Sequence, residues 1–553
     1  MRSNRLARAL AALTVAASAD MDGHVSAQAS NEPTDTVRFA EPSLAPSLTG
    51  LGAHHMPVSA SDPRAQQFFD QGLRLLYAFN HAEARRAFRE AARLDDRLAL
   101  AHWGEAMTLA LNLNAPMSAE SGRQAYDAVQ RAQALAAAAS PKERALISAL
   151  ASRFASDGAA PGPPLDRAYA ESMARVAEAF PVDPDVQTLY ADAVMNTMAW
   201  DYWQKDGSLK PEAELIRRAL ERLIDAHPDH AGAHHYYVHL MEGSRTPQAA
   251  EASADRLGGL MPAAGHIVHM PAHIYLRVGR YADAAEANVR AIAADEDYLA
   301  QCQAQGLYPV SYYPHNLHFL WAAATLEGRS AVAIDAARQV AAKVPHHHAG
   351  ALAWTADFPV TPWLAYVRFG RWREMLTEPS PPSTEPYAMG IWRYARGVAF
   401  TARGDVARAE AEVAALTALL DHDAFRTTLK DSPLLTNLQV ASRIVRGELA
   451  SRAGRHDEAV RLLGDATALE EAIPYNEPPC GISRRARCWA RCCLQPTARL
   501  TPKSSIARTS NDSARTGGRS LGCGRAWSRS GVWTRRGRSA RGTTRRGRAQ
   551  TCR

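Results

Sequence analysis

Seven histidines recur at equivalent places within one stretch of this 553-residue chain. The interval from His235 to His269 is 34 residues, and so is the interval from His239 to His273. A neutral imidazole offers one lone pair to a metal ion, and side chains three or four residues apart lie on one face of a helix. The pattern predicts a metal site whose ligands are His235, His239, His266, His269, His273, His315 and His318.

Imidazoles with few thiolates nearby favour Zn, Cu(II) or Fe as the bound ion. Glu242, one turn beyond His239, is a candidate carboxylate ligand or a hydrogen-bond partner of a ligand. The histidines have three alternative interpretations: they bind an organic or peptide ligand, they form structural hydrogen bonds alone, or they form a protonated cluster that binds anions at low pH. An organic ligand would contact the surrounding aromatic residues, for which the candidates are Tyr236, Tyr275, Tyr313 and Trp321.

Prolines interrupt the helical spacing of these histidines. Pro271 lacks an amide hydrogen, so a helix either kinks there or begins there. If a helix begins at Pro271, His266 and His269 lie on the turn that enters it. Pro314 likewise predicts a helix start that places His315 in the first turn, where a charged end of a ligand would dock.

The elements that must position these side chains are helices in a tandem repeat. Apolar residues follow a spacing of three and four from residue 61 to residue 479, with little indication of strands. Small or apolar residues recur at fixed offsets from a glycine, which lets two antiparallel helices approach closely. The sets are Gly72, Ala84, Phe88 and Ala91; Gly397, Ala409 and Val413; and Gly447, Ala459, Leu463 and Ala466.

This spacing resembles the tetratricopeptide repeat, a helix–turn–helix unit with a 34-residue period. The resemblance implies an all-α fold, a right-handed α-solenoid over residues 61–479 whose first helices line a concave groove. Units that begin at Ala231, Gly265 and Pro314 would place the histidines in the groove of residues 231–330. The same places in other units hold Gln66, Phe69, Leu73, Ile391, Tyr394 and Val398.

Three longer pieces resemble a group of exported bacterial tetratricopeptide proteins that has no settled activity. They are "LGAHHMPVSASDPRAQQFFDQGLRLLYAFNHAEA", "GHIVHMPAHIYLRVGRYADA" and "YYPHNLHFLWAAATLEGRS". The resemblance therefore implies a fold and an exported class of protein, and it implies no reaction.

The start of the chain is typical of a secretory signal peptide. Arginines precede a short Ala-rich apolar run, and small-residue cleavage sites end by residue 29. We expect a signal peptide at 1–29, a Pro/Ser/Thr-rich linker at 30–60, and a periplasmic or extracellular protein with no membrane span. The alternative is a cytoplasmic protein with an Ala-rich start. Cys302, the one cysteine before residue 480, agrees with export because it cannot form an internal disulfide.

Residues 480–553 differ in composition from everything before them. They hold 18 arginines, one lysine and a single acid, Asp512, together with six of the seven cysteines. Without them the chain is acidic by eleven charges, although the sequence pI is about 9.0. The tail is either a basic nucleic-acid-binding arm or the product of a frameshift near Pro479. Rereading it in the shifted frame gives amphipathic, charge-balanced strings like the upstream repeats, so we favour a frameshift, a tail disordered as written, and no nucleic-acid partner.

The sequence lacks a P-loop, a GxSxG elbow, a dinucleotide-binding glycine motif, an HExxH motif and an EF-hand loop. We therefore predict a binding or scaffold protein whose groove takes a peptide, a protein or a small molecule, with a metal ion held by the histidines. One alternative is a metal-dependent enzyme, hydrolytic or oxidative, in which an open His site activates water or dioxygen. A second alternative is an assembly scaffold that needs neither ligand nor metal.

Overall fold

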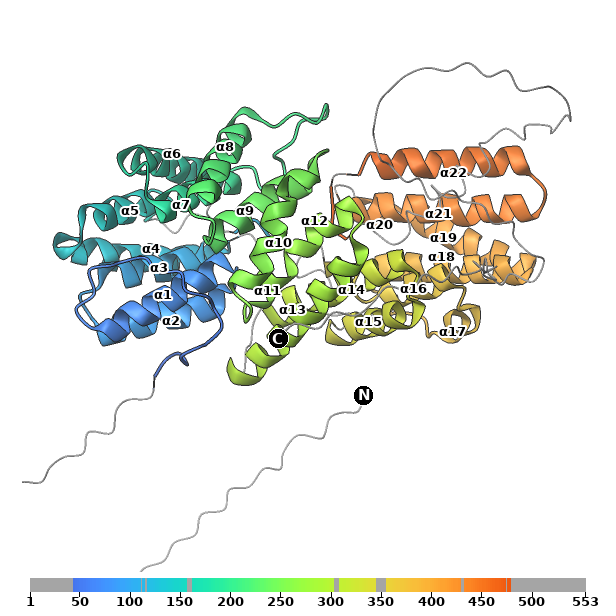
Figure 1. The fold of residues 1–553 in the computed structure, drawn as a ribbon. Helices are drawn as coiled ribbons and strands as arrows, with labels where there is room; N and C mark the ends of the chain where they lie inside the picture. The colour runs from blue at the N-terminus through green and yellow to red at the C-terminus, as the bar shows by residue number, and fades with distance from the viewer. Residues whose placement is uncertain are drawn as a thin grey trace, which may run out of the picture. The chain divides into compact units, whose positions relative to one another are not determined.

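The computed structural model describes residues 43–110, 112–114, 117–156, 162–302, 308–344, 355–428, 432–473 and 475–478. These residues form helices and connecting segments, with no β-strand among them (Figure 1). One isolated antiparallel bridge joins Trp203 to Leu209. The prediction of an all-α chain of tetratricopeptide-like hairpins is confirmed. The chain divides after Ser43, and all the described helices belong to the second unit.

The first helices form successive antiparallel pairs. Three of them begin with an N-cap side chain followed by proline, at Asp62–Pro63, Ser140–Pro141 and Asp183–Pro184. Ser140 and Glu143 also form a reciprocal capping box. The bounds are α1 Pro63–Tyr77, α2 His81–Leu94, α3 Ala99–Leu109, α4 Ala119–Leu135, α5 Pro141–Ala151, α6 Pro163–Ala179, α7 Pro184–Asn196 and α8 Pro211–Ala226.

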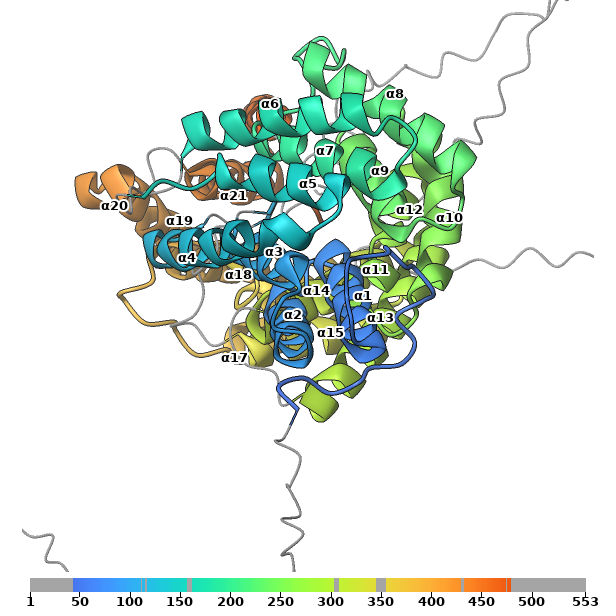
Figure 2. The same ribbon diagram turned by 90° about the vertical axis from the view of Figure 1, so that its left-hand side faces the viewer.

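Close packing of α1 against α2 explains the repeated glycine position. The two helices lie side by side in Figure 2. A Cβ atom added to Gly72 would lie 2.8 Å from the ring of Phe88, closer than carbon atoms pack. Phe88 is fully buried, and its ring also fills the space opposite Gly104 of α3. The small residue therefore sets the distance between the helices, as the sequence predicted.

The central helices carry the histidines. The first helix of one hairpin begins at Ala231 and that of the next at Gly265, at the predicted 34-residue interval. Pro271 starts a new helix, so the predicted interruption is confirmed, and Gly279 ends that helix with a φ of 87° that favours glycine. The bounds are α9 Ala231–Glu242, α10 Glu251–Leu260, α11 Gly265–His269, α12 Pro271–Val278, α13 Tyr281–Cys302, α14 Tyr312–Glu327 and α15 Ser330–Lys343.

The last helices end in the hairpin of α21 and α22, which lie side by side in Figure 1. After α22, residues 475–478 return to the side chains of α12, because Glu477 pairs with His273. The bounds are α16 Thr361–Phe369, α17 Trp372–Thr377, α18 Pro386–Arg403, α19 Val406–Asp421, α20 Asp423–Thr428, α21 Pro433–Arg452 and α22 His456–Glu471. Short 3₁₀ turns occur at Ala136–Ala138, Pro247–Ala250 and Tyr308–Val310.

Residues 44–60 of the predicted linker lie against the helices. Side chains of the helices accept hydrogen bonds from their backbone amides at Leu44, Leu48, Met56 and Ser59. The predicted signal peptide and the tail from residue 480 lie outside the described residues. Among the described helices, none combines the length and hydropathy needed to cross a bilayer.

Candidate functional site

Six of the seven predicted histidines gather in one cluster, which we call the His cluster. They come from α9, α11, α12 and α14, and their side chains are buried, except that His315 is half-buried. Neighbouring ring centroids lie 4.7 Å apart for His235 and His239, 4.7 Å for His269 and His273, and 4.9 Å for His269 and His315. The members are His235, His239, His266, His269, His273 and His315.

The His cluster divides into two groups of three. His235, His239 and His266 form the first trio, and His269, His273 and His315 form the second. Within each trio, one ring nitrogen per residue lies within 4.8 Å of the others. Each trio also has two Nε2 atoms facing each other: those of His235 and His266 are 3.1 Å apart, and those of His269 and His273 are 2.8 Å apart.

Hydrogen bonds at Nδ1 fix the tautomers of several of these rings. His235 Nδ1–H donates to the Tyr77 carbonyl oxygen at 2.6 Å, because a carbonyl can only accept. His269 Nδ1–H donates to Asn288 Oδ1 at 2.7 Å, while the amide nitrogen of Asn288 donates to the Ala284 carbonyl. His239 Nδ1–H donates to a carboxylate oxygen of Glu242 at 2.9 Å. Each of these three rings therefore presents the lone pair of its Nε2, as metal-bound histidines do.

Two buried carboxylates flank the second trio. One oxygen of Glu242 accepts from His239, and the other contacts Nδ1 of His273. Glu477 approaches the same Nδ1 at 2.7 Å. Burial disfavours the charged form of His273, but these carboxylates outweigh it and raise its pKa to about 10. Burial would raise the pKa of Glu242, yet His273 and His239 hold it below its usual range.

The other imidazoles of the His cluster are neutral near pH 7. Burial, reinforced by neighbouring rings, holds the pKa values of His235, His266 and His269 well below the usual range. Two buried nitrogens, Nε2 of His239 and Nδ1 of His266, have no hydrogen-bond partner among the described residues. Unpartnered polar atoms in a buried site indicate room for a ligand that the polypeptide does not supply.

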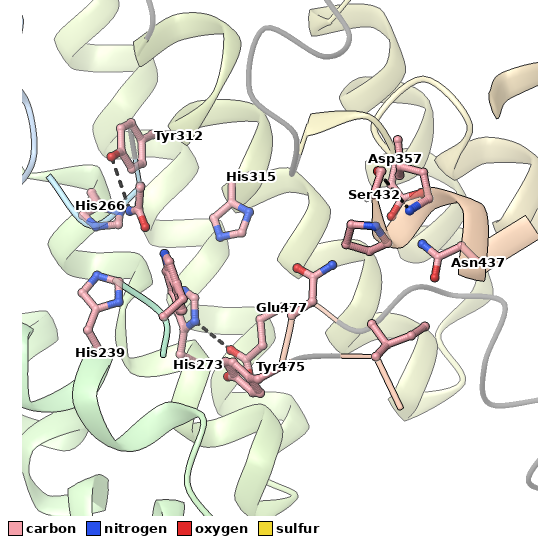
Figure 3. Close-up of a pocket in the computed structure, with 16 residues that line it drawn as sticks. His239, His266, His273, Tyr312, His315, Asp357, Ser432, Asn437, Tyr475 and Glu477 are labelled. Atoms are coloured by element: carbon pink, nitrogen blue, oxygen red, sulfur yellow. Dashed lines mark hydrogen bonds and ion pairs between the residues drawn. The ribbon is translucent and has the colours of Figure 1, made fainter. Parts of the chain in front are cut away.

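A cavity of about 270 Å³ adjoins the His cluster. In Figure 3 the rings of His239, His266, His273 and His315 border one side of it, and Glu477 lies beside them. The opposite wall carries polar side chains from the start of α21 and from the segment before α16. The other lining residues include Asn114, Trp200, Tyr312, Asp357, Ser432, Asn437, Tyr475 and Asn476.

A buried network behind α11 holds the backbone of His266. The hydroxyl of Tyr308 accepts from the His266 amide at 3.3 Å and donates to Asp295 Oδ1 at 2.8 Å. The amide of Asn316 donates to the other oxygen of Asp295 at 2.7 Å. Tyr308 thus supports the His cluster from behind, and residues 303–307 lie outside the described residues.

Asp295 makes the stability of this network depend on pH. Burial raises its pKa to about 7, so the folded protein holds the proton that the unfolded chain releases near pH 4. As pH rises from about 4 to about 7, stability is therefore lost. We expect Asp295→Asn, which is uncharged at every pH, to be more stable relative to wild type at pH 8 than at pH 5, by a few kcal/mol. Chemical unfolding of both proteins at both pH values tests this, and an equal difference at the two would contradict it.

One predicted metal ligand and the four predicted aromatic contacts lie outside this site. His318 stacks on Trp321, with centroids 4.9 Å apart and planes 7° from parallel, and it also contacts Phe358. Trp321 is not among the residues that line the cavity. The hydroxyl of Tyr275 donates to Asp255, that of Tyr313 donates to Glu296, and Tyr236 packs against Phe79.

The residues that sequence reasoning missed come from distant parts of the chain. Trp200, Tyr475 and Glu477 line the cavity. No spacing relates Trp200 or Glu477 to the histidines, since they arrive through tertiary contacts.

A separate group of His54, Asp185 and His230 is explained by hydrogen bonding. His230 Nδ1 accepts from the Ala233 amide at 3.1 Å, so its Nε2 carries the proton and points at Asp185 Oδ1, 3.4 Å away. That same oxygen accepts from His54 at 2.8 Å and from the Tyr77 hydroxyl at 2.9 Å. Because His230 has no free lone pair, this group fastens the segment that contains His54 to α7 and α9 and offers no metal site.

No protein-family model matches the sequence, and no curated protein is significantly similar to it. Among solved structures, the chain is similar to a human IFIT1 dimer with m7Gppp-AAAA, at 13% identity over 76% of this chain and 92% of that chain, with a TM-score of 0.32. It is also similar to yeast Tom70, at 10% identity over 78% and 89%, with a TM-score of 0.29. A third is the APC/C hetero-tetramer Cut9–Hcn1, at 15% identity over 78% and 76%, with a TM-score of 0.32. Because these scores are low, the fold assignment rests on the chain's own helices.

Proposed function

We propose that this helical-repeat protein binds a transition metal ion through the His cluster and takes a small molecule or an extended peptide in the adjoining cavity. The observation that carries the proposal is the convergence of six imidazoles, with ring nitrogens within 4.8 Å of one another in each trio. Zn, Cu(II) and Fe suit such a donor set. The residues that would hold the ion are His235, His239, His266, His269, His273 and His315.

Structural hydrogen bonding alone accounts poorly for this arrangement. Burying six imidazoles costs free energy unless their polar atoms find partners. The second nitrogens of His239 and His266 have no such partner among the described residues. The Nδ1 atoms of His235, His239 and His269 are anchored on oxygen acceptors, which leaves the Nε2 lone pairs of these three rings aimed into the cluster. A metal ion would satisfy those lone pairs together.

The cavity supports the second half of the proposal. It reaches His239, His266, His273 and His315, so a molecule in it would meet the metal ligands directly. Aromatic rings at Trp200, Tyr312 and Tyr475 offer apolar contact, and the amides of Asn114, Asn437 and Asn476 offer hydrogen bonds. Because bound ligand and metal would touch, the same site favours a metal-dependent enzyme as the second candidate function.

The proposal includes export to the periplasm or the outside of the cell. Its support is the sequence pattern at 1–29 and the near absence of cysteine before residue 480. We propose no nucleic-acid partner, because the described residues belong to the part of the chain that carries net negative charge, which repels the phosphate backbone.

Metal analysis of the full-length chain tests the proposal. The protein is purified without a polyhistidine tag or chelator, and its metals are quantified by mass spectrometry beside His239→Ala/His266→Ala. We expect near-stoichiometric metal in the wild type and a large loss in the variant. His234→Ala is the matched control, because this buried α9 histidine bonds the Pro228 carbonyl and lies outside both trios. A folded wild type that holds no metal, even after incubation with Zn, Cu(II) or Fe(II), would overturn the proposal.

A further inference from the structure

We infer that the His cluster holds two metal ions, one in each trio, an inference that rests on the proposed metal binding. Six imidazoles exceed the needs of one ion, because Zn and its usual competitors take about three or four protein ligands. The two trios share no residue. Each contains its own pair of facing Nε2 atoms, and each pair marks a separate point of convergence.

Each trio also has its own means of orientation. The Tyr77 carbonyl, from the end of α1, orients His235 of the first trio. Asn288, from α13, orients His269 of the second trio. Two different elements thus position the two groups, as expected for two built sites rather than for one site with surplus histidines.

Glu242 is the link between the trios. One of its oxygens accepts from His239 of the first trio, and the other contacts His273 of the second. Its side chain is fully buried, so its negative charge is available to both ions without screening by solvent. Ring centroids across the boundary lie 5.9 Å apart for His266 and His269 and 6.1 Å for His239 and His273. The ions would therefore be neighbours.

The two sites differ in chemistry. The first trio offers imidazole nitrogens only, whereas the second also has the carboxylate of Glu477 within 2.7 Å of His273. Members of both trios line the cavity. Two adjacent ions can bind both oxygens of one ligand, so an oxyanion or dioxygen bridging them is the class of small ligand that this pair of sites would take.

Zinc stoichiometry of the full-length protein, measured by native mass spectrometry with zinc as the only added metal, tests the inference. We expect about two ions per wild-type chain, one in His266→Ala and one in His315→Ala. His318→Ala, which alters α14 outside the cluster, should keep both. A single ion in the wild type would overturn the second site and leave the proposed metal binding intact, whereas no ion would overturn both. Retention of two ions in His266→Ala or His315→Ala would also contradict the inference.

Copper provides a readout that does not depend on partial unfolding of a variant. Two neighbouring Cu(II) ions couple magnetically, so the wild type should show an electron paramagnetic resonance signal well below its copper content. Each single-trio variant should show a signal equal to its remaining copper. A wild-type signal equal to two isolated ions would contradict adjacent sites.

Discussion

Replacing Glu242 by glutamine is expected to weaken zinc binding by about 10- to 100-fold. The carboxylate accepts from His239 through one oxygen and contacts Nδ1 of His273 through the other. Glutamine has one acceptor oxygen and an amide nitrogen that only donates, so it cannot serve both rings: either His239 loses its acceptor, or His273 keeps only Glu477. A competition titration against a coloured zinc chelator measures the change.

The matched control for that substitution is Glu251→Gln. Glu251 is a half-exposed carboxylate on α10 that pairs with Arg280, so its replacement removes a charge without touching the cluster. Zinc affinity in this control should equal that of the wild type. An unchanged zinc affinity in Glu242→Gln would show that the Glu242 carboxylate does not contribute to zinc binding.

The largest expected effect on stability comes from Phe88→Ala. The fully buried ring lies against Gly72 of α1 and Gly104 of α3, neither of which has a side chain to fill the space it would leave. Removal of a buried phenylalanine costs about 3–5 kcal/mol of unfolding free energy. Chemical unfolding measures the total, and hydrogen exchange should show the loss of protection concentrated in α1, α2 and α3.

Val289→Ala on α13 serves as the control for this prediction. Its side chain is 53% exposed, and exposed substitutions of this kind change stability by less than about 0.5 kcal/mol. Equal stabilities for Phe88→Ala and Val289→Ala would contradict the close packing described for the first hairpins. Since Tyr77 of α1 supplies the carbonyl that orients His235, weaker zinc binding should accompany the loss of packing.

The repeat was predictable because each hairpin is encoded locally. Gly72 and Phe88 predict the close approach of α1 and α2 that the structure shows. The interval of 34 residues placed His235 and His269 at the same point of successive hairpins, and both are buried in the cluster. The break at Pro271 did not scatter the histidines, since His269 and His273 remain 4.7 Å apart across it.

The sequence did not predict the directions of individual side chains, nor which distant segments of the chain would contact the histidines. His318 is one turn beyond His315, but its ring stacks on Trp321 instead of reaching the cluster. Tyr275 and Tyr313 direct their hydroxyls to carboxylates of neighbouring helices. Glu477 follows the last described helix, and no local pattern could relate it to His273, because tertiary packing brings the two together.

Anomalous diffraction at the zinc edge, from crystals of the zinc-loaded full-length protein, tests the central claim most directly. We expect anomalous density between the facing Nε2 atoms of His235 and His266 and between those of His269 and His273. Zinc density at other positions, with none inside the His cluster, would contradict it.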